Sequence, residues 1–248
     1  MNVLGVIPAR YQSTRLPGKP LADILGRPMI QWVYENVSRS ALLDEVIVAA
    51  DDNRVIAAVE RFGGKAVMTS RDHATGTDRV AEVADRYDAR IVVNIQGDEP
   101  FVNPGMIDEI VQPLLEDNSI PMSTLMHCIE DREDLCNPNV VKVVNDARGF
   151  ALYFSRSLIP FPRHENLHRA YEHIGIYAYR KDFLLRCAKM SPTLLEKTES
   201  LEQLRVLENG FRIRVVQTEQ DYIPLSVDTK GDLEKARILA QSTHMQEE

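Results

Sequence analysis

The chain has 248 residues, 44% of them hydrophobic, and its 29 Lys and Arg against 37 Asp and Glu give a formal net charge of −8. This length and apolar content suffice for one large α/β domain. The acidic balance argues against general attraction to nucleic acid or to an anionic membrane, so we expect a small-molecule partner and neither of these two.

The three cysteines include no C-x-x-C pair, which is typical of free thiols in a reducing compartment. No window approaches ~18 uninterrupted apolar residues, and the first residues show no cleavage-site pattern. We therefore expect a cytoplasmic protein.

Short runs rich in Val and Ile alternate with helical patterns in the first half of the chain. These runs predict buried strands at 3–7, 45–50, 65–69, 90–95 and 140–144. Apolar residues at helical spacing predict helices within 26–40, 51–64 and 76–87. Strand and helix in turn indicate an α/β fold, with a doubly wound, mostly parallel sheet and helices on both faces. Ligands bind beyond the carboxyl ends of such strands, so the segments after Ile7, Thr69 and Ile95 are candidate sites.

The second half breaks this alternation. The stretches "ALYFSR" (151–156) and "HIGIYAYR" (173–180) alternate with period two and predict strands; His173, Gly175 and Tyr177 share a polar face. We expect helices near 181–190 and 197–208, a strand in "FRIRVVQT", and a closing helix from about 230. The chain is predicted to be a single domain over 1–248, with one part over 1–120 and about 211–248 and a smaller embedded α+β lobe over about 121–210.

The stretch "IPARYQSTRLPGKPLAD" after the first strand carries Arg10, Arg15 and Lys19 with no acid before Asp23. Its prolines stiffen the loop and Gly18 permits close backbone approach. Two guanidinium forks and an ammonium suit a polyphosphate, although a solvated loop with scattered cations is the alternative. No G-x-G-x-x-G follows the strand and no P-loop motif occurs, which disfavours a dehydrogenase or a P-loop ATPase.

Two acidic positions are candidate magnesium ligands. Asp98 in "NIQGDEP" follows a buried strand, and Asp228 in "LSVDTKGD" follows a short apolar stretch. Carboxylate oxygens suit Mg²⁺, which takes one or two carboxylates plus substrate phosphates. Alternatively, Asp98 is only a turn residue, and Asp228 only neighbours a capping box formed by Thr229 and Asp232.

Eight short stretches in register resemble one family. They are "IPARYQSTRLPGKPL", "ATGTDR", "NIQGDEP", "NPNVVKVV", "ALYFSR", "HIGIYAYR", "LEQLR" and "VDT". Together they resemble the 3-deoxy-manno-octulosonate cytidylyltransferases, from about Asn2 to about Ile238. The family usually has V-D-T-P-E-D where this chain has Lys230 and Gly231 after the Thr, and this departure weakens the predicted start of the last helix.

The resemblance implies an enzyme of the nucleotide-diphospho-sugar transferase fold type. It joins CTP to the sugar acid 3-deoxy-manno-octulosonate (Kdo) and releases pyrophosphate, giving CMP-Kdo for lipopolysaccharide assembly. The part over 1–120 and 211–248 would then bind the nucleotide. Arg10, Arg15 and Lys19 would hold the triphosphate. Cytosine would lie near Pro8, Ala9 and the 72–79 segment, with Thr77 and Arg79 as candidate contacts.

The resemblance also implies the remaining site residues. Mg²⁺ would be held by Asp98 and Asp228, and a second ion mostly by substrate oxygens, so we name no general base. Arg10, Lys19, Asp98 and Asp228 are the expected catalytic residues. The expected sugar contacts are Gln96, Arg156 (for the sugar carboxylate), His173, Tyr177, Glu202 and Gln203. A structural histidine at His173 and a solvated helix face at Glu202 are the alternatives.

Three rival functions are open at this point. The chain could activate another acid sugar, such as a sialic acid or 8-amino-Kdo, or it could be a hexose-1-phosphate nucleotidyltransferase. It could also be a non-catalytic nucleotide-binding module, although the two aspartates argue against this. The family is commonly dimeric, so we expect a homodimer in which the lobe over about 121–210 supplies the interface.

Overall fold

The computed structural model describes residues 1–247, and the side chains at 165 and at 243–247 are left out of the description. The chain divides into two compact units. Unit 1 comprises Met1–Asp108 and Gln220–Glu248, and unit 2 comprises Glu109–Glu219, which extends beyond the predicted lobe at both ends. Within the described residues, no helix has the length and apolar character needed to span a membrane.

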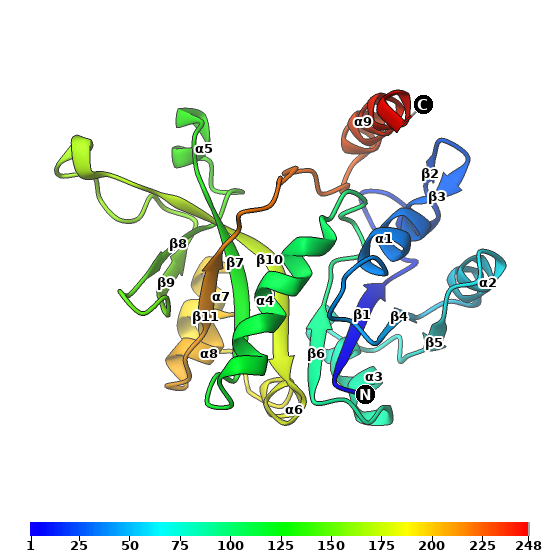
Figure 1. The fold of residues 1–248 in the computed structure, drawn as a ribbon, viewed down its shortest axis with the longest axis horizontal. Coiled ribbons are helices and arrows are strands. Elements are labelled where there is room, and N and C mark those ends of the chain that lie inside the picture. The colour runs from blue at the N-terminus through cyan, green and yellow to red at the C-terminus, as the bar shows by residue number, and fades with distance from the viewer. Residues whose placement is uncertain (248) are drawn as a thin grey trace. The chain divides into compact units, whose positions relative to one another are not determined.

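Unit 1 contains four parallel strands (Figure 1). They are β1 (Val3–Ala9), β4 (Glu45–Ala50), β5 (Ala66–Met68) and β6 (Ile91–Asn94). Their order is β6-β1-β4-β5, and in the centre Val6 lies opposite Ile47 on one side and Asn94 on the other. The structure confirms all four predicted strands. Because they are parallel, their carboxyl ends meet at one edge.

The α-helices of unit 1 are α1 (Met29–Val37), α2 (Asn53–Arg61), α3 (Gly76–Arg86) and α9 (Lys230–Glu247). Three of these four begin at side-chain caps, whereas α1 begins after Pro28 without one. The Asp52 side chain accepts the Arg54 N–H at the start of α2 (2.9 Å), and Thr75 and Asp78 form a capping box on α3. The three predicted helices of the first half are confirmed. Unit 1 also holds a short hairpin, β2 (Asp23–Ile24) with β3 (Arg27–Pro28), and the 3₁₀ turn η1 (Lys19–Leu21).

The last helix starts where predicted despite Lys230 and Gly231. Asp232 accepts the Thr229 N–H at 3.0 Å, and the Asp232 N–H donates to Thr229 Oγ1 at 3.2 Å. This capping box is formed by the residues on either side of Lys230 and Gly231, and it satisfies backbone donors at the start of the helix without them. The predicted box and the predicted helix are both confirmed.

Unit 2 has five strands of mixed direction. They are β7 (Met122–Cys128), β8 (Lys142–Asn145), β9 (Ala151–Ser155), β10 (Tyr171–Arg180) and β11 (Arg214–Gln217). β11 is parallel to β7, whereas β10 is antiparallel to both β7 and β8, and β8 is antiparallel to β9. β7 was not predicted. Its Ser123 and Thr124 interrupt the apolar pattern, although both are fully buried.

The helices of unit 2 are short. They are α5 (Arg132–Cys136), α6 (Lys181–Cys187), α7 (Leu194–Glu199) and α8 (Leu204–Glu208); α4 (Pro104–Glu116), also not predicted, runs from unit 1 into unit 2. The single helix predicted over 197–208 is wrong. Ser200 takes a left-handed conformation (φ 53°) and divides it. The break allows Leu201 and Leu204 to be buried together.

Candidate active site

The cationic segment after β1 folds back on itself. The Gly18 N–H donates to the Tyr11 carbonyl at 3.1 Å, and Gly18 has φ 70°, a conformation that a side chain would strain. The 3₁₀ turn η1 follows directly and begins at Lys19. The side chain of Arg15 stays 64% exposed while that of Lys19 is only 14% exposed. One cation is therefore directed into the protein and the other toward solvent.

Lys19 lies between two carboxylates that are far apart in sequence. Its Nζ is 2.5 Å from Asp98 Oδ2 and 2.8 Å from Asp228 Oδ1, and Arg15 is 3.0 Å from the other oxygen of Asp228. A backbone bond from the Val227 N–H to the Asp98 carbonyl (2.9 Å) fixes the two segments together. The predicted convergence of Asp98, Asp228 and the cationic segment is confirmed.

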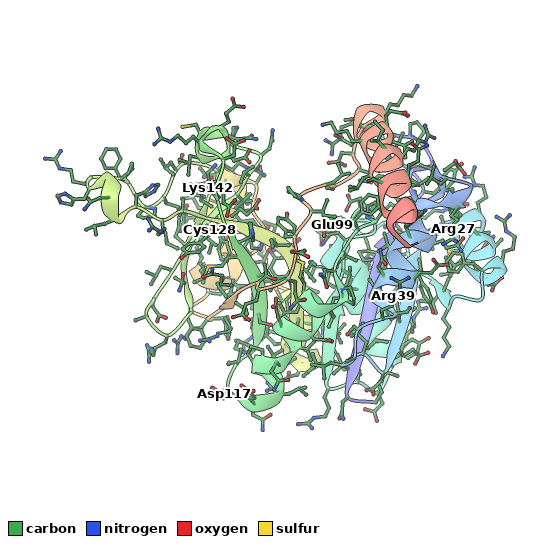
Figure 2. The ribbon with its side chains drawn as sticks, turned by 45° about the horizontal axis from the view of Figure 1, so that its top comes forward. Arg27, Arg39, Glu99, Asp117, Cys128 and Lys142 are labelled. Carbon is green, nitrogen blue, oxygen red and sulfur yellow. The ribbon has the colours of Figure 1, made fainter. Side chains whose placement is uncertain are left out.

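Charge and burial at this cluster act against each other. Burial alone would lower the pKa of Lys19, but the charge of Asp98 and the hydrogen bonds to both carboxylates raise it above its ordinary value. Burial, together with the charge of Asp98, raises the pKa of the adjacent Glu99 to about 8. Glu99, labelled in Figure 2, is therefore mostly protonated at neutral pH. Sequence reasoning missed Glu99, because only the fold shows that it is buried.

A cavity of about 390 Å³ opens beside this cluster within unit 1. Such a volume is in the range of small-molecule sites. The residues around it come from the end of β1, the cationic segment, the start of α3 and the exit of β6. They are Pro8, Ala9, Arg10, Gln12, Ser13, Thr14, Arg15, Lys19, Pro20, Gly76, Gln96, Gly97 and Asp98.

Six residues predicted to bind nucleotide line this cavity, whereas Thr77 and Arg79 do not. Arg79 is fully buried; it bonds to Thr69 Oγ1 and lies 3.3 Å from Asp51 Oδ2. In the structure, the Arg79 side chain therefore supports the segment at the end of β5. Gly76 takes the position at the cavity instead, where a Cβ would meet Pro8 at 3.6 Å. Contacts of Thr77 and Arg79 with the base stay predictions. The lining residues Gln12, Ser13 and Thr14 were missed although they belong to the same cationic segment.

The polar face of β10 in unit 2 carries uncharged groups. The His173 and Tyr177 rings are 5.3 Å apart, and His173 Nε2 is 3.0 Å from Thr124 Oγ1 on β7. Burial lowers the pKa of His173 to about 3, and burial with the charge of Glu202 raises the pKa of Tyr177 well above its ordinary value. Both side chains are therefore neutral around pH 7. This face offers hydrogen bonds without a net charge.

The turn at Ser200 is followed by two further predicted sugar contacts of unit 2. Gln203 is only 7% exposed, and its Nε2 has no hydrogen-bond partner among the described residues. Buried polar groups are nearly always paired, so this amide indicates a bound group or water. Glu202, beside it, is half-buried. Gln96, the remaining amide, lies in unit 1 and lines the cavity there.

Arg156 makes contacts that the sequence did not predict. Its guanidinium donates to the carbonyls of Glu199 (2.7 Å), Pro138 (2.8 Å) and Ser200 (3.4 Å). It therefore holds the Ser200 turn in place. A guanidinium has five N–H groups, so these three bonds leave donors for a carboxylate, and that contact stays a prediction.

The carboxylate oxygens of Asp98 and Asp228 suit a divalent cation. The ammonium of Lys19 acts as a stand-in, because one cation already receives an oxygen from each of Asp98 and Asp228. Among the side chains that the structure describes, no three from His, Cys, Asp or Glu form a metal-ligating group. That fits Mg²⁺ held by one or two carboxylates together with substrate phosphates. The metal itself stays a prediction.

Comparison with known proteins shows the family to which the chain belongs. Residues 4–214 match the cytidylyltransferase family model. The 3-deoxy-manno-octulosonate cytidylyltransferases of Geotalea uraniireducens (strain Rf4) and Geobacter sulfurreducens (strain ATCC 51573 / DSM 12127 / PCA) are 56% and 54% identical to this chain. Each alignment covers 95% of this chain, and 97% and 98% of the respective relative.

Solved structures agree with the fold. A structure of CMP:2-keto-3-deoxy-manno-octonic acid synthetase in complex with CTP has a TM-score of 0.94 and 46% identity, over 98% of this chain and 100% of that chain. The 4-diphosphocytidyl-2C-methyl-D-erythritol synthase of Anaerococcus prevotii DSM 20548 shares the fold alone, with a TM-score of 0.62 at 16% identity over 97% and 98% of the two chains. The predicted α/β fold class is confirmed. The chain belongs to the cytidylyltransferase family, and within it to the 3-deoxy-manno-octulosonate cytidylyltransferases.

Proposed function

We propose that this protein transfers CMP from CTP to the anomeric hydroxyl of Kdo, forming CMP-Kdo and pyrophosphate. The observation that carries the proposal is the cavity at the end of β1, where three cations and Asp98 meet beside Asp228. This cavity belongs to a chain that is 56% identical to a cytidylyltransferase named for this sugar.

The cationic segment accounts for the triphosphate. Arg10 and Arg15 offer planar forks to phosphate oxygens, and Lys19 adds a compact charge. In an in-line attack on the α-phosphorus, the protein has mainly to align the reactants and neutralise charge. Lys19 and Arg15, which now pair with Asp228, would turn to the β- and γ-phosphates as these leave as pyrophosphate.

Asp98 and Asp228 would hold Mg²⁺, because their oxygens already converge on one cation. When bound, the ion would supply Lewis-acid stabilisation of the phosphate oxygens.

The neutral groups of unit 2 suit a polyhydroxylated sugar. His173, Tyr177 and Gln203 supply donors and acceptors, and Glu202 accepts from hydroxyls. Arg156 would use its remaining N–H groups for the sugar carboxylate. Gln96 would contact the sugar or a phosphate from the cavity in unit 1.

The test is CTP-dependent release of pyrophosphate, measured with Kdo, with 8-amino-Kdo, with a sialic acid and with no sugar. Release that requires Kdo is the expected result. Release with another acid sugar but not with Kdo would overturn the substrate. Tight CTP binding with no release in any mixture would favour a non-catalytic nucleotide-binding module.

The expected homodimer and the cytoplasmic location belong to this proposal. Unit 2 exposes Leu152, Phe161 and Leu167 by 63%, 80% and 74%, and such side chains are common at interfaces. Light scattering of the wild type and of Phe161→Ser tests the dimer. If both proteins are monomers, the homodimer is rejected. CTP is a cytoplasmic nucleotide, and cell fractionation tests the location.

A further inference from the structure

We propose that Glu82 is a positioning residue that aims Arg10 at the nucleotide through the loop that follows β5. This loop, residues 69–75, is called the β5 exit loop below. The inference rests on the proposed function, because Arg10 matters only if a nucleotide binds in the cavity that it lines.

Glu82 lies on α3 and gathers the β5 exit loop with its carboxylate. Its Oε2 accepts the Ser70 N–H at 2.9 Å and lies 2.5 Å from Nε2 of His73. Its other oxygen receives Arg86, whose guanidinium also donates to the Met68 carbonyl at 2.9 Å. One side chain therefore fixes the loop at both of its halves.

The charge state of Glu82 suits this task. Burial alone would raise its pKa, but the hydrogen bonds from Ser70 and His73 outweigh burial and lower it. Glu82 is thus a carboxylate at neutral pH. A carboxylate has no proton to give, so the Nε2–H of His73 donates to it.

The loop in turn holds Arg10. The Arg10 guanidinium donates to the His73 carbonyl at 2.8 Å. The backbone of the next residue is fixed separately, because the Tyr11 N–H donates to Asp51 Oδ1 at 2.9 Å. Among the hydrogen bonds that the structure gives Arg10, only the one to the His73 carbonyl therefore orients its guanidinium. Arg10 otherwise lies exposed, and a long exposed side chain loses much rotamer freedom when it binds a phosphate. Because the loop already holds the guanidinium, part of this rotamer freedom is lost before CTP binds, which lowers the entropy cost of binding.

The reach of Glu82 and its charge can be separated. Glu82→Gln keeps the length and an acceptor for Ser70 but loses the charge. Glu82→Asp keeps the charge but is one methylene too short. If position is what matters, Glu82→Gln retains most CTP affinity and Glu82→Asp behaves like Glu82→Ala. Asp85→Ala, on the exposed side of the same helix, removes the same charge and is the matched control.

The experiment measures CTP binding by calorimetry, without sugar, in a double-mutant cycle with Arg10→Ala. Glu82→Ala should weaken CTP ~10-fold, comparable to one charge-assisted hydrogen bond. In the Arg10→Ala background the same change should cost less than about twofold, because the two residues act as one unit. Equal losses in both backgrounds, or unchanged CTP binding in Glu82→Ala, would overturn the inference. Failure of the wild type to bind CTP would instead reject the proposed function.

A second readout does not depend on activity. Arg71 in the β5 exit loop is 75% exposed, so trypsin can reach the bond after it. Glu82→Ala and Glu82→Asp should be cut there faster than wild type, Glu82→Gln should be cut no faster than Arg86→Ala, and Asp85→Ala should be cut at the wild-type rate. If Glu82→Ala does not fold, Arg86→Ala removes only the outer support and should show smaller changes of the same kind. No change in cutting or in CTP affinity with Arg86→Ala and Glu82→Asp would contradict the proposal.

Discussion

Units 1 and 2 place polar groups in contrasting ways. In unit 1 the groups of the candidate site are charged and paired, with Lys19 between Asp98 and Asp228. In unit 2 the polar face of β10 is neutral, and His173 and Tyr177 lie on it with the Thr124 hydroxyl. The difference fits two kinds of ligand. A triphosphate requires matched charge, whereas a row of sugar hydroxyls requires neutral donors and acceptors in a dry surrounding.

Removing one charge from unit 1 should have the largest effect. Asp98→Asn keeps the size of the side chain and the backbone bond to Val227, so the protein should fold normally. Turnover should fall on the order of 10²–10³-fold, because the amide no longer holds a cation beside the phosphates. Pyrophosphate release at saturating Mg²⁺ measures this. Asp88→Asn, an exposed aspartate of unit 1, is the control, and near-normal turnover of Asp98→Asn would remove it from the metal site.

Lys19→Met should separate the two tasks of the charged site. CTP should bind more weakly by about 1.5–3 kcal/mol, since one charge-assisted contact is lost. Mn²⁺ should bind more tightly to the nucleotide-free protein, because the ammonium between the carboxylates is gone. Calorimetry measures both. Lys65→Met, which removes an exposed surface pair with Glu45, should change neither. Unchanged CTP affinity would instead show that the cationic segment is a solvated loop with scattered cations.

The neutrality of unit 2 predicts a pH effect on stability. The pKa of His173 is about 3 in the folded protein and close to 6.5 in the unfolded chain, so the unfolded chain binds the extra proton. The contribution of His173 to stability is therefore present above about pH 6.5 and is lost as the pH falls toward 3.

His173→Gln should remove this dependence. The free energy of unfolding, measured by urea at pH 7, 6, 5 and 4, should fall less steeply in the variant than in the wild type. Burial raises the pKa of Glu172 to about 7, so Glu172 gives the unfolding free energy a pH slope of the opposite sign. This contribution is the same in both proteins and drops out when the two curves are compared. His164→Gln, at an exposed position, is the control. Parallel curves for wild type and His173→Gln would show that His173 is not buried in the neutral form.

The smallest effect concerns Gly231 at the start of α9, which carries no side chain to contact the charged site. Gly231→Ala should stabilise the protein by ~0.5–1 kcal/mol, because glycine loses more conformational freedom in a helix. The added Cβ would meet only Thr229 Oγ1, at 3.6 Å. Thermal unfolding measures the change. Gly26→Ala should do the reverse, since Gly26 has φ 80°. A lower melting temperature for Gly231→Ala would show that the glycine is required there.

The sequence predicted unit 1 better than unit 2. Strands and helices of unit 1 follow from long periodic patterns with caps, such as Asp52 and Thr75. In unit 2, β7 was missed because its buried Thr124 is polar and interrupts the apolar pattern; its hydroxyl lies within hydrogen-bond distance of three groups of β10. The break at Ser200 also depends on distant partners, since Arg156 binds the carbonyls on both sides of the turn. Neither feature has a local signal.

Strand periodicity and charge are local properties of the chain, so the α/β order of elements, the cationic segment and the two aspartates could be predicted from the residues alone. Which groups meet depends on the fold. The structure shows Arg79 bonded to Thr69 at the end of β5, gives Glu99 its raised pKa, and links Glu82 to Arg10 through the β5 exit loop. The physical reason is that burial and pairing depend on residues distant in sequence, and they decide whether a charge binds a ligand or supports the fold.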